Sequence, residues 1–254
     1  MTGMTGKTAL VTGGSRGIGA AIVRRLTTAG VHVAINYSGS REAAERLAAD
    51  SVAAGGRAFA VQGDIATLDG IAAVFAACDA QFGGLPNLDI LVNNAGYGSD
   101  GSNASLAAED EPHFDRQLAV NVKGPHFVSQ QALPRLRDGG RVVNIGSIAG
   151  RTAQPSSAGY AMGKRALQSL TLSMAQLVAP RGITVNLVAP GAVDTDFISH
   201  LRARPGFDAS MAQLTPMGRL GQPDDIAGAV MMLIGDDARW VTGQIIEASG
   251  GVQL

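Results

Sequence analysis

Residues 12–19 have the sequence TGGSRGIG, which follows the short apolar run TALV at 8–11. Glycines at positions 13, 17 and 19 of this stretch allow the backbone to turn tightly and to approach a ligand closely. A helix that begins there offers free N–H groups and the positive end of its dipole to a phosphate. The stretch therefore predicts a strand, a turn and a helix that together bind a pyrophosphate. Because the spacing is not G-x-G-x-x-G, a turn that only packs a helix on a sheet stays open as the alternative.

The rest of the chain repeats this alternation of short apolar runs and longer helical segments. We expect strands at 8–14, 31–37, 58–64, 88–96, 141–147, 183–190 and 244–248. We expect helices at 17–29, 41–54, 67–82, 111–133, 157–179 and 224–235. Apolar strands without polar alternation, separated by helices, indicate a parallel sheet that is covered on both faces. The prediction is an α/β fold with a doubly wound sheet of about seven strands, in a single domain over 1–254. A closed eight-stranded barrel is the alternative, and the glycine turn favours the open sheet.

The composition describes a globular chain without the features of a nucleic-acid or membrane protein. The formal net charge of −1 supplies no basic surface for nucleic acid. The apolar runs are far shorter than the ~20 residues of a membrane span, and the N-terminal sequence has no apolar signal region. The single cysteine, Cys78, fits a reducing compartment, so we expect a cytoplasmic protein whose start is Met1 or Met4. The histidines lack the spacing of metal ligands, so we expect no metal site.

The end of the second expected strand bears on the choice of dinucleotide. An acidic residue at this place would bind the ribose 2′-hydroxyl of NAD, but the chain has Asn36, Tyr37 and Ser38. Arg16 in the glycine turn and Arg41 nearby supply cations for a 2′-phosphate. The segment therefore favours NADP(H) over NAD(H), with ordinary turn residues as the alternative interpretation.

A tyrosine and a lysine stand one helical turn apart in the expected helix 157–179. Tyr160 and Lys164 are four residues apart, so both side chains lie on one face. Taken alone, such a pair is more often an amphipathic packing pair than an acid–base device. Ser147 follows the fifth expected strand, at the sheet edge where open α/β folds bind their ligands. This combination predicts a site in which the tyrosine exchanges a proton.

Taken together, these motifs resemble the classical short-chain dehydrogenase/reductase family from about residue 7 to the C-terminus. The resemblance rests on TGGSRGIG (12–19), NNAG (93–96), Asn121, Ser147, YAMGK (160–164) and PGAVDT (190–195). It implies a Rossmann-like sheet in the strand order 3-2-1-4-5-6-7, with helices on both faces. It also implies transfer of the pro-S hydride of the nicotinamide to or from a carbonyl carbon.

The resemblance assigns four catalytic residues. A free tyrosine has a pKa of roughly 10, and we expect Lys164 and the oxidised nicotinamide to lower that of Tyr160. Tyr160 would then act as general acid or base, while Ser147 hydrogen-bonds the substrate oxygen. By resemblance, Lys164 also contacts the nicotinamide ribose and Asn121 holds a water of the proton relay. The predicted activity is that of an NADP(H)-dependent ketoreductase acting on a carbonyl or a secondary alcohol.

The resemblance also implies the cofactor-binding residues. Asp64 and Ile65 match the adenine-binding pair, whereas Asn93 more plausibly stabilises the sheet. The full expected set is Gly13, Ser15, Arg16, Gly17, Ile18, Gly19, Asn36, Tyr37, Ser38, Asp64, Ile65, Asn94, Ala95, Gly96, Tyr160, Lys164, Pro190, Gly191, Val193 and Thr195. One departure from the family pattern is EASGG (247–251), where relatives often have an aspartate before the glycines.

The segment 194–220 has poor periodicity and several glycines and prolines, and by its position we expect it to cover the substrate. The residues expected to shape the substrate pocket are Tyr97, Ala149, Gln154, Gly191 and Phe197. None of them is a strong recogniser of charge, which suggests a neutral or mixed-polarity small molecule as the substrate.

Two other functions stay open. Reductases of 3-oxoacyl groups on acyl carrier protein tend to have an arginine where this chain has Gln176, although Arg135 and Arg137 offer another basic surface. A non-catalytic NADP(H) sensor would generally lose the tyrosine or the lysine, and both are present. The helices 111–133 and 157–179 are more apolar than one sheet face requires. The resemblance implies that they pair across a dimer axis in a homotetramer, which is the assembly that we expect.

Overall fold

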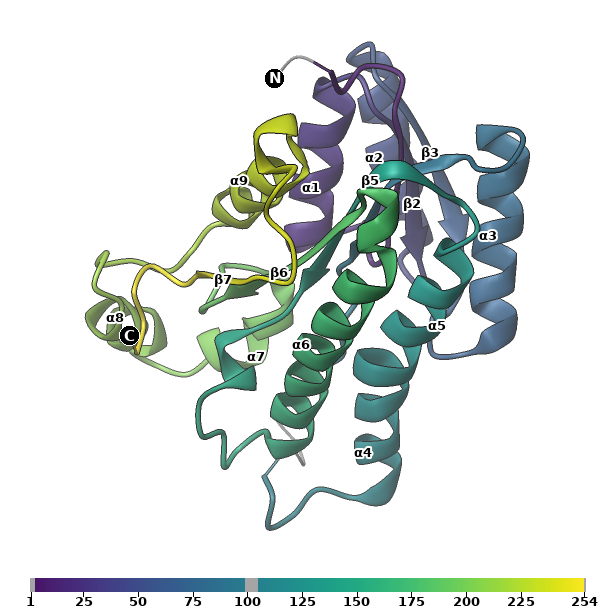
Figure 1. Ribbon diagram of the computed structural model, residues 1–254. Coiled ribbons are helices and arrows are strands. Elements are labelled where there is room, and N and C mark those ends of the chain that lie inside the picture. Colours follow the sequence, from purple (N-terminus) through teal and green to yellow (C-terminus); the bar gives the residue numbers. More distant parts are fainter. Residues whose placement is uncertain (1–2, 99–104, 254) are drawn as a thin grey trace.

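The computed structural model describes residues 3–98 and 105–253, in which strands and helices alternate (Figure 1). The strands are β1 (Thr8–Val11), β2 (His32–Tyr37), β3 (Arg57–Gln62), β4 (Leu88–Asn93), β5 (Leu136–Ile145), β6 (Thr184–Pro190) and β7 (Ile245–Ala248). The α-helices are α1 (Gly17–Thr28), α2 (Arg41–Ala53), α3 (Leu68–Phe82), α4 (Glu111–Leu118), α5 (Gly124–Ala132), α6 (Ala158–Val178), α7 (Ser199–Arg202), α8 (Phe207–Leu214) and α9 (Pro223–Ile234).

These strands form one parallel sheet in the order β3-β2-β1-β4-β5-β6-β7. The predicted fold class and strand order are therefore confirmed, and the barrel alternative is wrong. The strand order reverses between β1 and β4. In open α/β sheets the carboxyl ends of the strands at such a reversal leave a crevice, which is where ligands bind.

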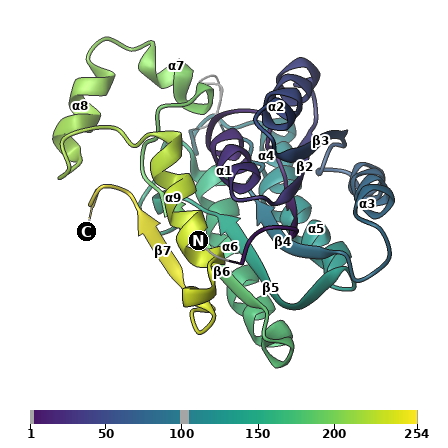
Figure 2. The same cartoon turned by 90° about the horizontal axis from the view of Figure 1, so that it is seen from above.

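Both faces of the sheet are buried, which explains the apolar runs without alternation. Ala9 and Val11 of β1 pack in one hydrophobic core, whereas Leu10 between them packs in the other. The first core is covered by α1, α2 and α9, and the second by α3, α5 and α6 (Figure 2). Successive strand residues point to opposite faces, so a strand between two helical layers must be apolar at every position.

The expected single helix at 111–133 is interrupted. A π-helical segment at Ala119–Lys123 lies between α4 and α5, and it contains Asn121. Pro125 has no N–H to donate to the carbonyl of Asn121 four residues earlier, which disfavours regular α-helical bonding here. Such single-turn π segments occur often at functional sites.

Two other expectations change in detail. β5 begins at Leu136 rather than at residue 141, because Leu136 pairs with Leu88 despite the two glycines that follow. The segment 194–220 contains α7 and α8, so it is more helical than its poor periodicity indicates (Figure 1). Among the described residues, no helix has both the length and the apolar character to span a bilayer.

Candidate functional site

A cavity of about 880 Å³ lies at the carboxyl edge of the sheet. Every residue predicted for the cofactor, the substrate or catalysis lines this cavity, with the exception of Asn121 and of Arg41, the second cation expected near the 2′-phosphate. Tertiary structure thus brings together segments as distant as the glycine turn, Tyr160 and Phe197. No group of histidine, cysteine or acidic side chains in the described part of the chain has the arrangement of a metal site.

The glycine turn is held in place by the segment that follows β4. The Asn94 side chain donates hydrogen bonds of 2.9 Å to the carbonyl oxygens of Thr12 and Gly13. The Thr12 hydroxyl oxygen accepts in return from the backbone N–H groups of Asn94 and Ala95. At Gly13, φ is +60°, and an added Cβ would lie 2.8 Å from the Cα of Ala95. A side chain at position 13 would therefore force the two segments apart.

The N-terminus of α1 fits an anionic ligand. The helix begins at Gly17 without a side-chain cap and without an acidic residue in its first turn. Its first N–H groups and the positive end of its dipole thus face the cavity without an internal counter-charge. This arrangement fits the pyrophosphate of a dinucleotide, as the sequence predicts.

Of the three residues expected at the 2′-phosphate, only Ser38 is exposed. Asn36 is 2% exposed; its amide nitrogen donates to the carbonyl oxygen of Gly63 at 3.0 Å, and its oxygen accepts from the N–H of Gly13. Tyr37 is buried as well. Asn36 therefore positions the glycine turn. The exposed groups available to a 2′-phosphate are Ser38 and Arg16.

The expected adenine-binding residue Asp64 has a partner that sequence reasoning missed. One carboxylate oxygen of Asp64 accepts from the N–H of Ala66, and the other accepts from Arg116 on α4 at 3.0 Å. The Arg116 guanidinium also lies 5.9 Å from the centre of the Tyr97 ring. Arg116 lines the cavity, but it lies 52 residues from Asp64 in the chain, and no local pattern marks it.

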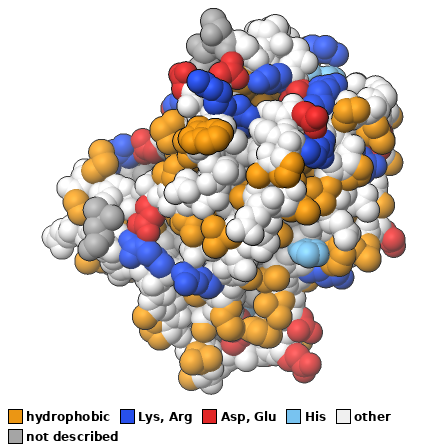
Figure 3. Space-filling view, viewed as in Figure 1, with side chains coloured by type: hydrophobic (Ala, Val, Ile, Leu, Met, Phe, Trp, Pro, Cys, Tyr) orange, Lys and Arg blue, Asp and Glu red, His pale blue; other side chains and the backbone are white. Residues whose placement is uncertain are grey.

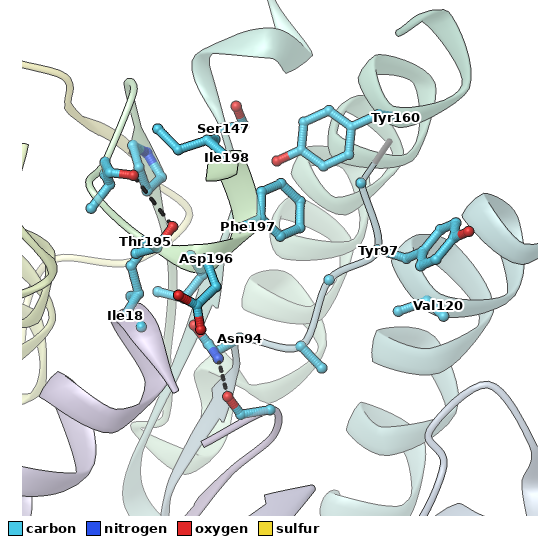
Figure 4. A pocket seen from close by; sticks show the side chains of 18 of the residues that line it. Ile18, Asn94, Tyr97, Val120, Ser147, Tyr160, Thr195, Asp196, Phe197 and Ile198 are labelled. Atoms are coloured by element: carbon cyan, nitrogen blue, oxygen red, sulfur yellow. Dashed lines mark hydrogen bonds between the residues drawn. The ribbon is translucent and has the colours of Figure 1, made fainter. Parts of the chain in front are cut away.

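Tyr160, Ser147 and Lys164 meet at one end of the cavity, where the Tyr160 hydroxyl points toward Ser147 (Figure 4). Lys164 is 4% exposed, and its Nζ donates to the carbonyl oxygen of Ile145 at 3.0 Å. The same Nζ lies 5.6 Å from the centre of the Tyr160 ring. One helical turn thus brings the phenol and the amine to the same face of α6, as the spacing predicts.

Burial governs the proton affinities of this pair. It raises the pKa of Tyr160 to about 12, although a hydrogen bond with Ser147 acts in the opposite direction. Burial also lowers the pKa of Lys164 to about 8. Burial thus opposes the lowering of the Tyr160 pKa that we expect from Lys164 and the oxidised nicotinamide, which stays a prediction for the complex.

Asn121 does not line the cavity, and its side chain is already engaged. Its amide nitrogen donates to the carbonyl oxygen of Tyr97 at 2.8 Å and to Gln117, and its oxygen accepts from the N–H of Tyr97. Asn121 therefore fixes the backbone that follows β4, a role that its place in the sequence does not reveal. The neighbouring Asn93 donates to Asn144 and Ser129, which joins β4 to β5 and α5.

Of the residues expected around the substrate, some lie beside Tyr160 and others pack away from it. Phe197 lies beside Tyr160, with ring centres 5.8 Å apart. The ring of Tyr97 packs instead toward His113 on α4, and its hydroxyl points away from Tyr160 in Figure 4. Ala149 is buried and its backbone N–H donates to the Ser147 hydroxyl, and the Gln154 side chain donates to the Thr152 hydroxyl.

The prediction that Arg135 and Arg137 form a basic surface is wrong. Arg135 forms a two-pronged ion pair with Asp79, and Arg137 pairs with Asp89 at 2.6 Å. Both arginines flank the start of β5, whereas the cavity lies at the carboxyl ends of the strands. Their charges are neutralised at the opposite edge of the sheet from the cavity.

An ion-pair network lies next to the departure at 247–251. Glu247 forms an ion pair with Arg151, which in turn donates to the carbonyl oxygens of Val252 and Gln253. This network fastens the C-terminal segment beside the loop that follows Ser147.

Residues 13–253 match the family model described as enoyl-(acyl carrier protein) reductase. An uncharacterised oxidoreductase of Methylorubrum extorquens is 42% identical over 255 residues, covering all of both chains. The 3-oxoacyl-[acyl-carrier-protein] reductase FabG of Staphylococcus aureus is 38% identical over 98% of both chains.

Among solved structures, the angucycline C-6 ketoreductase LanV has a TM-score of 0.91 and 40% sequence identity, over 98% of this chain and 96% of that chain. LanV was crystallised with bound NADP, and also with NADP and rabelomycin. The glycine turn, the Tyr160–Ser147–Lys164 cluster and these full-length matches agree: the chain belongs to the short-chain dehydrogenase/reductase family of oxidoreductases.

Proposed function

We propose that the protein is an NADP(H)-dependent ketoreductase that moves a hydride between the nicotinamide and the carbon of a carbonyl or secondary alcohol. One observation carries this proposal. Tyr160, Ser147 and Lys164 line the same cavity as the glycine turn. A substrate carbonyl near Tyr160 would thus lie beside a dinucleotide that is anchored at the N-terminus of α1.

The protein's own residues would bind and orient the reactants. The Ser147 hydroxyl would donate a hydrogen bond to the substrate oxygen, and Tyr160 would deliver its phenolic proton to that oxygen as the hydride reaches the carbon. A bound reduced nicotinamide supplies that hydride. Lys164 would stabilise the resulting phenolate, and a proton from solvent would restore Tyr160. In the reverse direction Tyr160 takes the proton from the alcohol.

The preference for NADP(H) is supported by the exposed groups near the end of β2. Ser38 and Arg16 are both exposed there, and no carboxylate stands at the end of β2. The nearest acidic partner, Asp196, lies 3.6 Å from Arg16, with both side chains largely in solvent, so this pair yields readily to a phosphate. The binding of NADP to the neighbour LanV supports the same preference.

We also propose that the substrate is a free small molecule. The relatives that act on acyl carrier protein make a carrier-bound thioester the second candidate. Against it, Arg135 and Arg137 are paired with aspartates at the far edge of the sheet. Apolar Phe197 lies beside Tyr160, and the apolar side chains of Ile198 and Leu201 line the same cavity.

A homotetramer is the assembly that we propose, and the cytoplasm is the location. Hydrophobic side chains gather on the face that contains α6, where Met162, Leu172 and Leu177 are exposed (Figure 3). Ile245 on β7 and Trp240 beside it are also exposed, and such surfaces commonly mark interfaces. A native mass near that of one 25.9 kDa chain at micromolar concentration would contradict the tetramer.

The first experiment is a fluorescence titration with NADPH and NADH, followed by absorbance assays with ketones, quinones and a 3-oxoacyl thioester. We expect tighter binding of NADPH and turnover of a free ketone that Tyr160→Phe abolishes without loss of NADPH binding. Turnover of the thioester alone would favour the carrier function. Tight binding of NADPH without turnover of any of these compounds would favour the sensor.

A further inference from the structure

Phe197 has an unusual position, directly between a glycine and the proposed proton donor. A Cβ atom added at Gly98 would lie 2.5 Å from Cζ and 2.8 Å from Cε1 of Phe197. The far end of the ring therefore sits against the bare backbone of Gly98, in space that any side chain at position 98 would fill. The Phe197 ring also lies 5.8 Å from that of Tyr160, at an angle of 48° (Figure 4).

The segment around Phe197 is held across the cavity by contacts on both sides. Thr195 lies against Gly17 of the glycine turn, since an added Cβ at Gly17 would lie 3.1 Å from Cγ2 of Thr195. Asp196 reaches Arg16 in the same turn. Phe197 itself reaches Gly98 on the other side. These contacts place one aromatic ring at a defined point of the cavity wall, next to the Tyr160 hydroxyl.

The Phe197 ring keeps an uncovered face. Its exposed fraction is 44%, although it contacts both Gly98 and Tyr160, and it lines the cavity. Apolar side chains from the following helices, Leu201, Phe207 and Met211, also line the cavity. An aromatic face left open inside a concave apolar site is suited to stack against a flat ring of a ligand.

We propose that Phe197, seated on Gly98, is the residue by which this site selects flat aromatic ketones over flexible aliphatic ones. This inference rests on the proposed ketoreductase function and adds its substrate class. A fused aromatic ketone would stack one ring on Phe197 and present its carbonyl to Tyr160 and Ser147. A flexible aliphatic ketone of similar size gains no such stacking and loses more conformational freedom when it is bound.

The test compares 1-tetralone with 2-octanone, using calorimetric binding to the NADP⁺-saturated protein and, separately, kcat/KM with NADPH. We expect the wild type to prefer 1-tetralone. Phe197→Ala should reduce this preference by about three- to tenfold, the range expected for one aromatic stacking contact. Gly98→Ala should cause a loss of similar size, because the new methyl group displaces the ring. The double variant should lose no more of the preference for 1-tetralone than either single variant, because both changes remove the same stacking contact.

Two control variants match these changes. Gly84→Ala adds a methyl group where nothing lies within 4 Å, and Leu214→Ala removes an exposed side chain of α8. Both should keep the wild-type preference. An unchanged preference in Phe197→Ala, or additive losses in the double variant, would overturn the proposal. Selective binding of 1-tetralone without turnover would support Phe197 as the selector and overturn the ketoreductase function instead.

Discussion

Gly163 of α6 packs against Asn121 of the π-helical segment through bare backbone. A Cβ atom added at Gly163 would lie 2.8 Å from the Cβ of Asn121, closer than two such atoms can approach. The glycine in the YAMGK motif thus allows α6, with Tyr160 and Lys164, to reach the segment that orients the Tyr97 backbone.

Replacing this glycine should therefore destabilise the protein. In Gly163→Ala, either α6 or the π segment must shift, and overpacking of this kind typically costs about 1–3 kcal/mol. Urea unfolding measures the loss, with Gly84→Ala as the control because a methyl group there meets nothing within 4 Å. Equal stability of the two variants would contradict the close packing of α6 on Asn121.

The buried amine of Lys164 should make stability depend on pH. Its pKa is about 8 in the folded protein, against 10.5 for an ordinary lysine, so between these values the unfolded chain binds more protons. Stability from this group should therefore rise as pH increases from 8 to 10. Above pH 10 the raised pKa of Tyr160 acts in the opposite direction. The measurement is the urea midpoint of the wild type minus that of Lys164→Met, and this signed difference should increase from pH 8 to pH 10. A constant difference over this window would show that Lys164 titrates normally.

Arg16 should distinguish the two dinucleotides. Arg16→Ala removes the exposed cation of the glycine turn, so we expect NADPH binding to weaken by about tenfold, as for the loss of one charged hydrogen bond of ~1.5 kcal/mol. NADH, which lacks the 2′-phosphate, should bind nearly as before. Arg41→Ala serves as the comparison, because Arg41 already contacts Glu45 and Gln62. Fluorescence titration gives both dissociation constants, and equal weakening for the two dinucleotides would place the 2′-phosphate elsewhere.

Arg135 should matter for stability and not for a carrier-bound substrate. The Arg135 guanidinium, through its hydrogen bonds, holds the pKa of Asp79 below its ordinary value. Arg135→Ala should therefore lower the unfolding free energy, and the deficit should shrink as pH falls below the ordinary pKa of an aspartate, toward the lowered pKa of Asp79 in the folded protein. If the protein turns over a 3-oxoacyl thioester, Arg135→Ala should do so at the wild-type rate. This should hold both for the acyl group on the carrier protein and for the acyl group on a short thiol. A loss confined to the carrier-bound form would show that this surface docks the carrier.

The sequence by itself determined the order of strands and helices, the parallel sheet and the glycine turn between β1 and α1. These features depend on local causes: apolar runs of strand length, helical composition, and glycines where the chain turns sharply. The pairing of Tyr160 with Lys164 is local as well, because four residues make one helical turn.

Tertiary structure alone decided what surrounds each side chain. It buried Asn36, paired Arg135 with Asp79 across 56 residues, and set the ring of Phe197 on Gly98. It also buried the hydroxyl of Tyr160, which raises the pKa of the phenol in the protein alone, because the extent of burial is fixed by segments far away in the chain. Periodicity and spacing carry the local geometry of a chain, whereas desolvation and the identity of a partner arise only when distant segments pack together.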